Sequence, residues 1–262
     1  MSASSHALSS CCAGFYELPV VEYLLGQSFH PGGPKLTRQL ASTALVSPKS
    51  RVLDVACGNG ASARIIAAEF GAMVTGCDYS AINLERAVAA SRTARLETKT
   101  QFVRSDAGRL PFASGTFDVS LCECSLCLFD NMDDVLEQVH RVLKPGGRIG
   151  ISDFFLDAPV PESLDGLLGQ VLCVAGAPSM AGYRDAFARA GFEYVRIRSV
   201  NWTLTDMIQR VRRRLNVLAT TPATAGAILP ADWGDPTRVL TDLEAFIASG
   251  GAGYLIATAR RA

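Results

Sequence analysis

The chain has 262 residues, of which 48% are hydrophobic and 19% are charged, so it is able to bury a sizeable core. Its 25 basic and 25 acidic residues cancel, and it contains no uninterrupted apolar run of about 18 residues. These features argue against a nucleic-acid binder with a basic surface and against a membrane-spanning protein. The N-terminus lacks the charged and apolar stretches of a secretory signal, so we expect a cytoplasmic protein whose eight cysteines are reduced.

The first 48 residues are predicted to form a helical cap. Helices are expected over 16–25 and 35–44, and a turn rich in glycine and proline, Phe29 to Pro34, separates them. His30 lies on this turn and is a candidate site residue. It either faces a substrate or makes only a backbone hydrogen bond.

From residue 51 onward, short apolar runs alternate with helical segments. Strands are predicted at 51–56, 73–77, 101–104, 117–122 and 148–153, with helices at 62–70, 81–93 and 133–143. Strands that alternate with helices form a parallel sheet covered on both faces. A ligand is therefore expected beyond the carboxyl ends of the strands, near the point where the strand order reverses.

The C-terminal part continues the same domain, which we place at 49–262. A helix is predicted at 180–190 with Gly191 as its end, followed by strands at 194–200 and 253–259. Between these strands, residues 203–250 are expected to form an insertion with helices at 205–218 and 236–248. The insertion is too short to own a core, so it should cover the site together with the N-terminal cap.

Small and acidic residues gather at the ends of the first three predicted strands. Asp54 leads into a turn of small residues, which lets a backbone pass close to a ligand and exposes the N–H groups of the next helix. Asp78 and Asp106 end the next two strands. The turn lacks the third glycine of the dinucleotide fingerprint, and the chain contains no Gly-Lys-Ser/Thr phosphate loop.

This series, from residue 50 to about 155 and including the Lys144-Pro145-Gly146-Gly147 turn, resembles class I S-adenosylmethionine-dependent methyltransferases. The resemblance implies a Rossmann-like α/β fold whose seven-stranded sheet is mostly parallel, with the last strand antiparallel. It also implies S-adenosyl-L-methionine as cofactor. The expected cofactor contacts are Asp54, Ala56, Gly58, Asn59 and Gly60 for the amino-acid end, Asp78 for the ribose, Asp106 and Ala107 for the adenine, and Tyr79 and Glu123 nearby.

Three cysteines fall within six residues at the end of the strand predicted at 117–122, where the reactive methyl group is expected. In an extended strand Cys122 and Cys124 point to the same face, while the direction of Cys127 depends on the turn. They are either small buried hydrophobes or soft ligands for a thiophilic centre. Glu123 between them is either a base or orienter for a substrate proton, or a carboxylate bonded to the cofactor.

Residues 118–147 also resemble the arsenite methyltransferase family without a gap. The resemblance places that family's arsenic-binding cysteines on Cys124 and on Cys173, which begins a matching Cys-Val-Ala-Gly-Ala run. The family's Tyr-Gly-Cys motif before the cofactor loop is missing here. The resemblance implies a trivalent metalloid held by Cys124 and Cys173, with a third thiolate from Cys122, Cys127, Cys11 or Cys12, and a thiol reductant as partner.

Three functions stay open. The first is methylation of a thiol-bound metalloid, in which Cys124 and Cys173 are the metalloid ligands. The second is methylation of an ordinary small molecule at O, N, S or C, which depends on Glu123 and His30 and leaves the cysteines structural. The third is a non-catalytic protein that binds a metal or metalloid through thiols. Each involves a small-molecule or metalloid-thiol partner rather than nucleic acid or membrane, in a monomer or homodimer.

Overall fold

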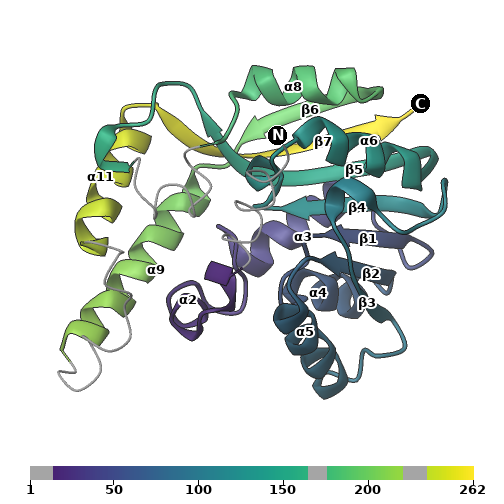
Figure 1. Ribbon diagram of the computed structural model, residues 1–262, viewed down its shortest axis with the longest axis horizontal. Helices are drawn as coiled ribbons and strands as arrows, with labels where there is room; N and C mark the ends of the chain where they lie inside the picture. Colours follow the sequence, from purple (N-terminus) through teal and green to yellow (C-terminus); the bar gives the residue numbers. More distant parts are fainter. Residues whose placement is uncertain (1–13, 165–175, 221–234) are drawn as a thin grey trace, which may run out of the picture.

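The computed structural model describes residues 14–164, 176–220 and 235–262 (Figure 1). Its centre is a seven-stranded sheet with the order β3-β2-β1-β4-β5-β7-β6. Neighbouring strands pair in parallel from β3 to β5, whereas β7 runs antiparallel to both β5 and β6. The fold expected from the sequence is therefore confirmed. The strands are β1 (Arg51–Val55), β2 (Met73–Asp78), β3 (Thr100–Arg104), β4 (Phe117–Glu123), β5 (Leu143–Leu156), β6 (Phe192–Ser199) and β7 (Ala252–Arg261).

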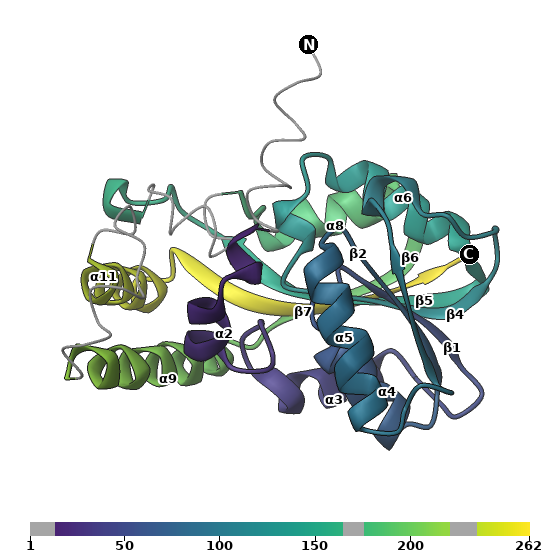
Figure 2. The same ribbon diagram turned by 60° about the horizontal axis from the view of Figure 1, so that its bottom comes forward.

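Helices cover both faces of the sheet, as Figure 2 shows. One face packs against α3 (Gly33–Thr43), α4 (Ala61–Glu69) and α5 (Ala81–Thr93), and the other packs against α6 (Met132–Val142) and α8 (Met180–Arg189). Alternate residues of a strand point to opposite faces. In β1, Val52 accordingly joins the cluster under α3 and α4, and Leu53 joins the cluster under α6 and α8.

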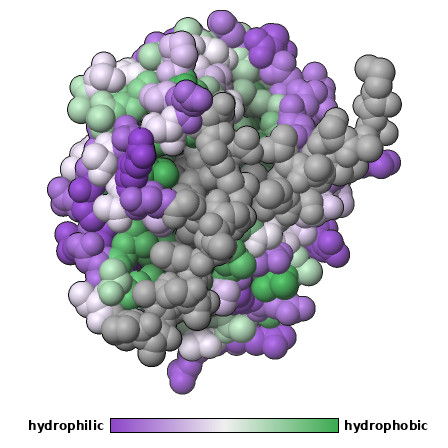
Figure 3. Space-filling view, turned by 60° about the vertical axis from the view of Figure 1, so that its left-hand side comes forward, coloured by the Kyte–Doolittle hydropathy of each residue, from purple (hydrophilic) through white to green (hydrophobic). Residues whose placement is uncertain are grey.

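Three further helices lie together at one end of the sheet (Figures 1 and 2). They are α2 (Pro19–Leu25), α9 (Trp202–Ala219) and α11 (Pro236–Ala248). Their apolar sides extend the cluster under α3 and α4, and Arg214 of α9 donates to the carbonyls of Tyr23 and Leu24 at the end of α2. On this side of the molecule, hydrophilic residues occupy much of the periphery and apolar residues gather nearer the middle (Figure 3). Among the described residues, no helix is long and apolar enough to cross a membrane.

Some element boundaries differ from the prediction. The helix predicted at 16–25 is interrupted at Leu18: residues 14–17 are helical, and α2 begins anew at Pro19, because proline is well placed in a first helical turn. The strand predicted at 148–153 begins at Leu143. Leu143 pairs with Phe117 of β4 and Arg148 pairs with Val119, so residues 144–147 form a bulge opposite Asp118. Within this bulge, Lys144 Nζ lies 2.6 Å from Oδ1 of Asp118. The predicted Pro/Gly turn is thus a bulge within a long strand.

Candidate active site

A cavity of about 380 Å³ opens at the carboxyl ends of β1, β2 and β4. It lies beside β1, where the strand order reverses between β2 and β4, the place at which open α/β sheets bind their ligands. Its volume is in the range of small-molecule sites. Of the residues predicted for the site, it is lined by Ala56, Gly58, Asn59, Tyr79 and Ala107, by Asp54, Asp78, Asp106 and Glu123, and by His30 and Cys124.

The turn after β1 folds back on itself through three left-handed residues, Ala56, Gly58 and Gly60. A Cβ atom on Gly60 would lie 2.9 Å from side-chain atoms of Ala87 and Phe102. Gly60 is not among the residues that line the cavity, and its contact with the cofactor stays a prediction. Its role in the fold is to let α4 and the turn pack against α5 and β3.

Three carboxyl groups near the turn offer acceptors toward the cavity. Asp54 is buried, and its Oδ2 has no hydrogen-bond partner among the residues that the structure describes. Burial above all, and then the negative charges of Glu123 and Asp78, raises the pKa of Asp54 well above its usual value. Asp78 accepts hydrogen bonds of 2.8 Å from the N–H groups of Gly58 and Ser80. Burial raises the pKa of Asp78 as well.

These groups fit S-adenosylmethionine. The unpartnered oxygen of Asp54 suits the ammonium group of the amino-acid end, because a cation compensates a buried carboxylate. The carboxylate of Asp78 is held by backbone donors and can still accept from ribose hydroxyls. Asp106 caps the next turn by accepting from Gly108 N at 2.8 Å. Asn59, in contrast, donates its side-chain amide to the carbonyl of Gln27, so it connects the turn to the segment before α3.

A buried polar network joins the N-terminal segment to the end of β4. His30 and Glu123 have side chains that are 6% and 4% exposed, and their Nε2 and Oε1 atoms lie 3.7 Å apart. Thr37 of α3 places its hydroxyl between them, 3.2 Å from Nε2 and 3.1 and 3.2 Å from the two oxygens of Glu123. Ser62 lies 3.3 Å from the same hydroxyl. His30 Nδ1 is 3.0 Å from the carbonyl of Pro31, which only accepts, so Nδ1 carries a proton.

The cysteines do not converge as expected. β4 ends at Glu123, and Cys124 has a φ of 55°, so the alternation that would place Cys122 and Cys124 on one face stops there. Cys122 packs under α6 and α8 and lies 3.0 Å from the hydroxyl of Ser125. Cys127 points to Asp153, with its Sγ 3.0 Å from Oδ1. Of these three cysteines, only Cys124 lines the cavity.

The predicted thiolate site gains no support from the described residues, which contain no group of three His, Cys, Asp or Glu able to hold a metal ion. Burial above all raises the pKa of Cys122 well above its usual value, and the charges of Asp153 and Asp54 raise it further. Cys11, Cys12 and Cys173 lie outside the described residues.

Sequence reasoning missed several cavity residues. Tyr16 and Phe29 line the cavity with their rings tilted and their centroids 5.5 Å apart, and an aromatic residue at the start of the predicted helix at 16–25 and another soon after its end were the available signal. Ser62 sits in the first turn of α4, directly after the glycine turn. Thr37, which does not line the cavity but contacts His30 and Glu123, gave no signal, because a threonine inside a helix has no pattern that distinguishes a site residue from a packed one.

The sequence matches a family model described as a methyltransferase domain over residues 53–151. Among curated proteins, it is 29% identical over 231 residues to the methyltransferase GfsG of Streptomyces halstedii, covering 87% of this chain and 80% of that protein. It is 31% identical over 171 residues to the O-methyltransferase rstn1 of Aspergillus nomiae, covering 64% of this chain and 76% of that protein.

Solved structures share the fold. The [4+2]-cyclase SpnF superposes with a TM-score of 0.80 at 24% identity, covering 97% of this chain and 96% of that one. The Haemonchus contortus phosphoethanolamine N-methyltransferase 2, in complex with S-adenosyl-L-methionine, superposes with a TM-score of 0.78 at 19% identity. That match covers 99% of this chain and 58% of the other.

Proposed function

This chain belongs to the class I S-adenosylmethionine-dependent methyltransferases, and we propose that it methylates a hydroxyl oxygen of a small molecule. S-adenosyl-L-methionine is the methyl donor and supplies an electrophilic methyl group on a positively charged sulfur. On this proposal, Asp54 receives the ammonium group of the donor, Asp78 the ribose hydroxyls, and Asp106 with Ala107 the adenine. We propose further that α2, α9 and α11 cover the acceptor side.

The proposal is carried by the hydrogen-bonding arrangement of His30 and Glu123, which leaves a proton acceptor between the two side chains. With Nδ1 protonated toward Pro31, the Nε2 atom of a neutral His30 holds a lone pair that faces the carboxylate of Glu123 across 3.7 Å. The hydroxyl of Thr37 has a single proton and cannot donate to both. The pair therefore has room for one more proton.

A hydroxyl acceptor must lose a proton when its oxygen is methylated. His30 and Glu123 both line the cavity, so a hydroxyl group that enters it can reach this pair. The proton passes to Nε2 of His30, and the resulting imidazolium is stabilised by the adjacent carboxylate of Glu123. Thr37 holds the carboxylate in place. This chemistry agrees with the name of the relative rstn1, an O-methyltransferase.

The test is turnover with a panel of aliphatic alcohols, phenols and amines, with S-adenosylhomocysteine as the measured product. We expect hydroxyl compounds to be methylated. Changing His30→Gln or Glu123→Gln should lower kcat by about 100-fold or more, because each variant removes a proton acceptor. Cys124→Ser is the matched control and should keep most of the activity. Turnover of hydroxyl compounds that neither His30→Gln nor Glu123→Gln affects would overturn the assignment.

The metalloid hypothesis is decided by the same assay with arsenite and glutathione under anaerobic conditions. The relatives support the small-molecule alternative better, and of the three clustered thiols only Cys124 lines the cavity. We therefore expect no arsenite-dependent formation of S-adenosylhomocysteine. Arsenite-dependent turnover that Cys124→Ser abolishes would instead favour a thiol-bound metalloid.

A further inference from the structure

The segment after β4 forms one wall of the cavity. The residues of this segment that line the cavity are Cys124, Ser125, Leu128 and Phe129. The segment contains η2 (Leu126–Leu128), a 3-10 helix of one turn. The backbone bonds across this turn are few, from Leu128 N to Ser125 O at 3.1 Å and from Phe129 N to Leu126 O at 3.5 Å. A turn with so little internal bonding depends on contacts with other elements for its position.

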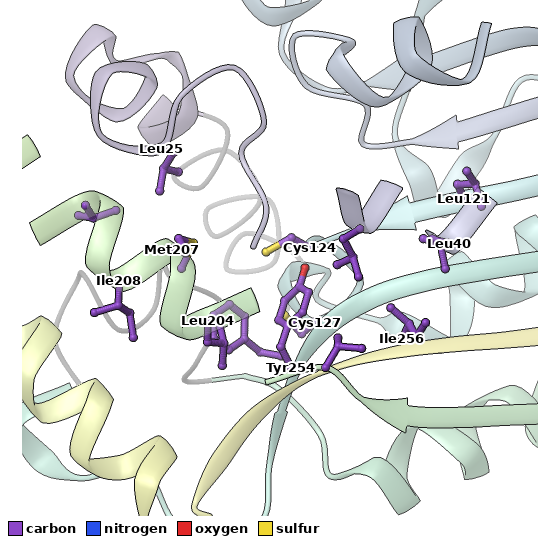
Figure 4. Packing of buried hydrophobic residues seen from close by; sticks show 14 of the residues in the cluster. Leu25, Leu40, Leu121, Cys124, Cys127, Leu204, Met207, Ile208, Tyr254 and Ile256 are labelled. Carbon is purple, nitrogen blue, oxygen red and sulfur yellow. The ribbon is translucent and has the colours of Figure 1, made fainter. Parts of the chain in front are cut away.

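Asp153 of β5 provides such a contact. Its side chain is fully buried, and Oδ2 accepts from Cys127 N at 2.9 Å while Oδ1 accepts from Cys127 Sγ at 3.0 Å. Oδ1 also accepts from the N–H group of Phe154 at 2.9 Å. Both donors of Cys127 are therefore held by one carboxylate of the sheet. Figure 4 shows Cys127, Tyr254 and Cys124 in the same region of the buried cluster.

The arrangement requires a carboxylate. Its two oxygens accept from the three donors of Cys127 and Phe154, whereas the amide of an asparagine would turn an NH₂ group toward one of them. Hydrogen bonds to a charged acceptor are also stronger than bonds between neutral groups. Neither Asp153 nor Cys127 lines the cavity, so any effect that they have on the reaction is transmitted through the wall.

We propose that Asp153 and Cys127 are a positioning pair that fixes residues 124–129, the wall against which the methyl acceptor lies. The inference rests on the proposed function for the identity of this wall. It gives a role to Cys127, which the sequence suggested as a metalloid ligand. It also explains why that thiol points away from the cavity.

The test uses Cys124 as a reporter of the wall, because its thiol lines the cavity and no acceptor needs to be known. The full chain with saturating S-adenosylhomocysteine is treated with iodoacetamide, and the rate of Cys124 alkylation is followed by peptide mass spectrometry. Cys127→Ala removes one donor and Asp153→Asn removes the charged acceptor. We expect both variants to alkylate Cys124 about tenfold faster than the wild type. Cys127→Ser keeps a donor toward Asp153 and should remain within about twofold of the wild type.

The matched control is Leu121→Ala, which leaves a cavity in the core near the end of β4 without touching the pair. It should lower the melting temperature without accelerating the alkylation of Cys124. The dissociation constant of S-adenosylhomocysteine should change little in any variant. The proposal is overturned if Cys127→Ser and Cys127→Ala behave alike, or if Leu121→Ala accelerates alkylation as much as Asp153→Asn. A wild type that methylates no hydroxyl compound would defeat the proposed function and leave this result standing.

Discussion

Asp54, Asp78 and Glu123 bring three carboxyl groups to one cavity. The pKa of Asp54 is raised because the group is buried and because the other two charges oppose its ionisation. A cationic ligand offsets both the burial of the Asp54 carboxylate and its repulsion by the other two charges. The same carboxyl groups therefore lower the stability of the free protein and favour binding of a positively charged donor.

The variant Asp54→Asn separates stability from binding. We expect the unfolding free energy of the free protein to rise by about 1–3 kcal/mol at pH 8, because a buried carboxyl group with one unpartnered oxygen is removed. Binding of S-adenosylmethionine should weaken at least about tenfold, since the partner of its ammonium group is lost. Urea unfolding and calorimetric titration measure the two effects. A variant that binds the donor as tightly as the wild type would show that Asp54 is not the ammonium partner.

Asp153 gives stability a defined dependence on pH. Burial raises its pKa from 3.8 to about 6, while hydrogen bonds from Cys127 and Phe154 limit the rise. The folded protein therefore binds this proton more tightly than the unfolded chain, and stability falls as the pH rises from about 4 to about 6. Asp153→Asn does not titrate at this position. Relative to this variant, the unfolding free energy of the wild type should fall by about 3 kcal/mol over this pH range. Urea unfolding of both proteins at pH 4.5, 5.5 and 7 measures the difference, and a pH-independent difference would contradict it.

Gly60 requires its small size. A side chain there would clash with Ala87 and Phe102, and its φ of 71° is strained for other residues. We expect Gly60→Val to destabilise the fold by about 2 kcal/mol or more. Gly115→Val is the matched control, because Gly115 also has a positive φ but has open space around it. Thermal unfolding measures the stability of both variants. An equal loss of stability in the two would mean that backbone strain alone explains the effect.

At the scale of the elements, Arg214 of α9 adds a polar contact to the apolar packing of α2. A helix leaves its last carbonyl groups without partners, and Arg214 supplies donors to two of them in α2 at 2.7 and 3.0 Å. The contact joins segments that are 190 residues apart in the chain. It contributes, with the bonds of Glu17 to Ser80 and Arg86, to holding the N-terminal segment against the rest of the molecule.

Arg214→Ala should loosen this segment. We expect a loss of about 1–2 kcal/mol in unfolding free energy and faster hydrogen exchange over residues 19–31. Arg213→Ala on the exposed side of the same helix is the control and should change neither. Exchange over residues 19–31 that stays at the wild-type rate in Arg214→Ala would mean that apolar packing alone holds α2.

At the scale of the whole molecule, the cavity combines parts from distant regions of the chain. The sheet supplies carboxyl groups from β1, β2 and β4, and the N-terminal segment supplies His30 and two aromatic rings. Asn59 and Gln27 connect these two parts next to the turn after β1. Ligand binding should therefore stabilise both parts together.

Saturation with S-adenosylhomocysteine tests this coupling. At about 100 times its dissociation constant, it should raise the unfolding free energy by about 2.7 kcal/mol. Hydrogen exchange should slow over residues 51–62 and also over residues 26–33, while residues 236–248 of α11 should exchange as before. Protection confined to residues 51–62 would show that the N-terminal segment does not close on the bound ligand.

The sequence by itself determined the class of the fold and pointed to most of the carboxyl groups that line the cavity. Hydrophobic periodicity is a local property, so strands and helices were predictable from short windows apart from their ends. Asp54, Asp78 and Asp106 were predictable as a group, because consecutive parallel strands bring their carboxyl ends to the same edge. The packing constraint at Gly60 was not predictable, since its close approach to Ala87 and Phe102 depends on tertiary structure.

The tertiary structure decided the acceptor side. Thr37 and Glu123 are 86 residues apart, and only the packing of α3 against the sheet brings them together. The direction of Cys124 depends on one left-handed residue directly after a strand, and the directions of Cys122 and Cys127 depend on partners in other elements. A spacing of cysteines in the sequence specifies distance along the chain. Whether the thiols meet is set by backbone angles and by distant donors and acceptors, which no local pattern encodes.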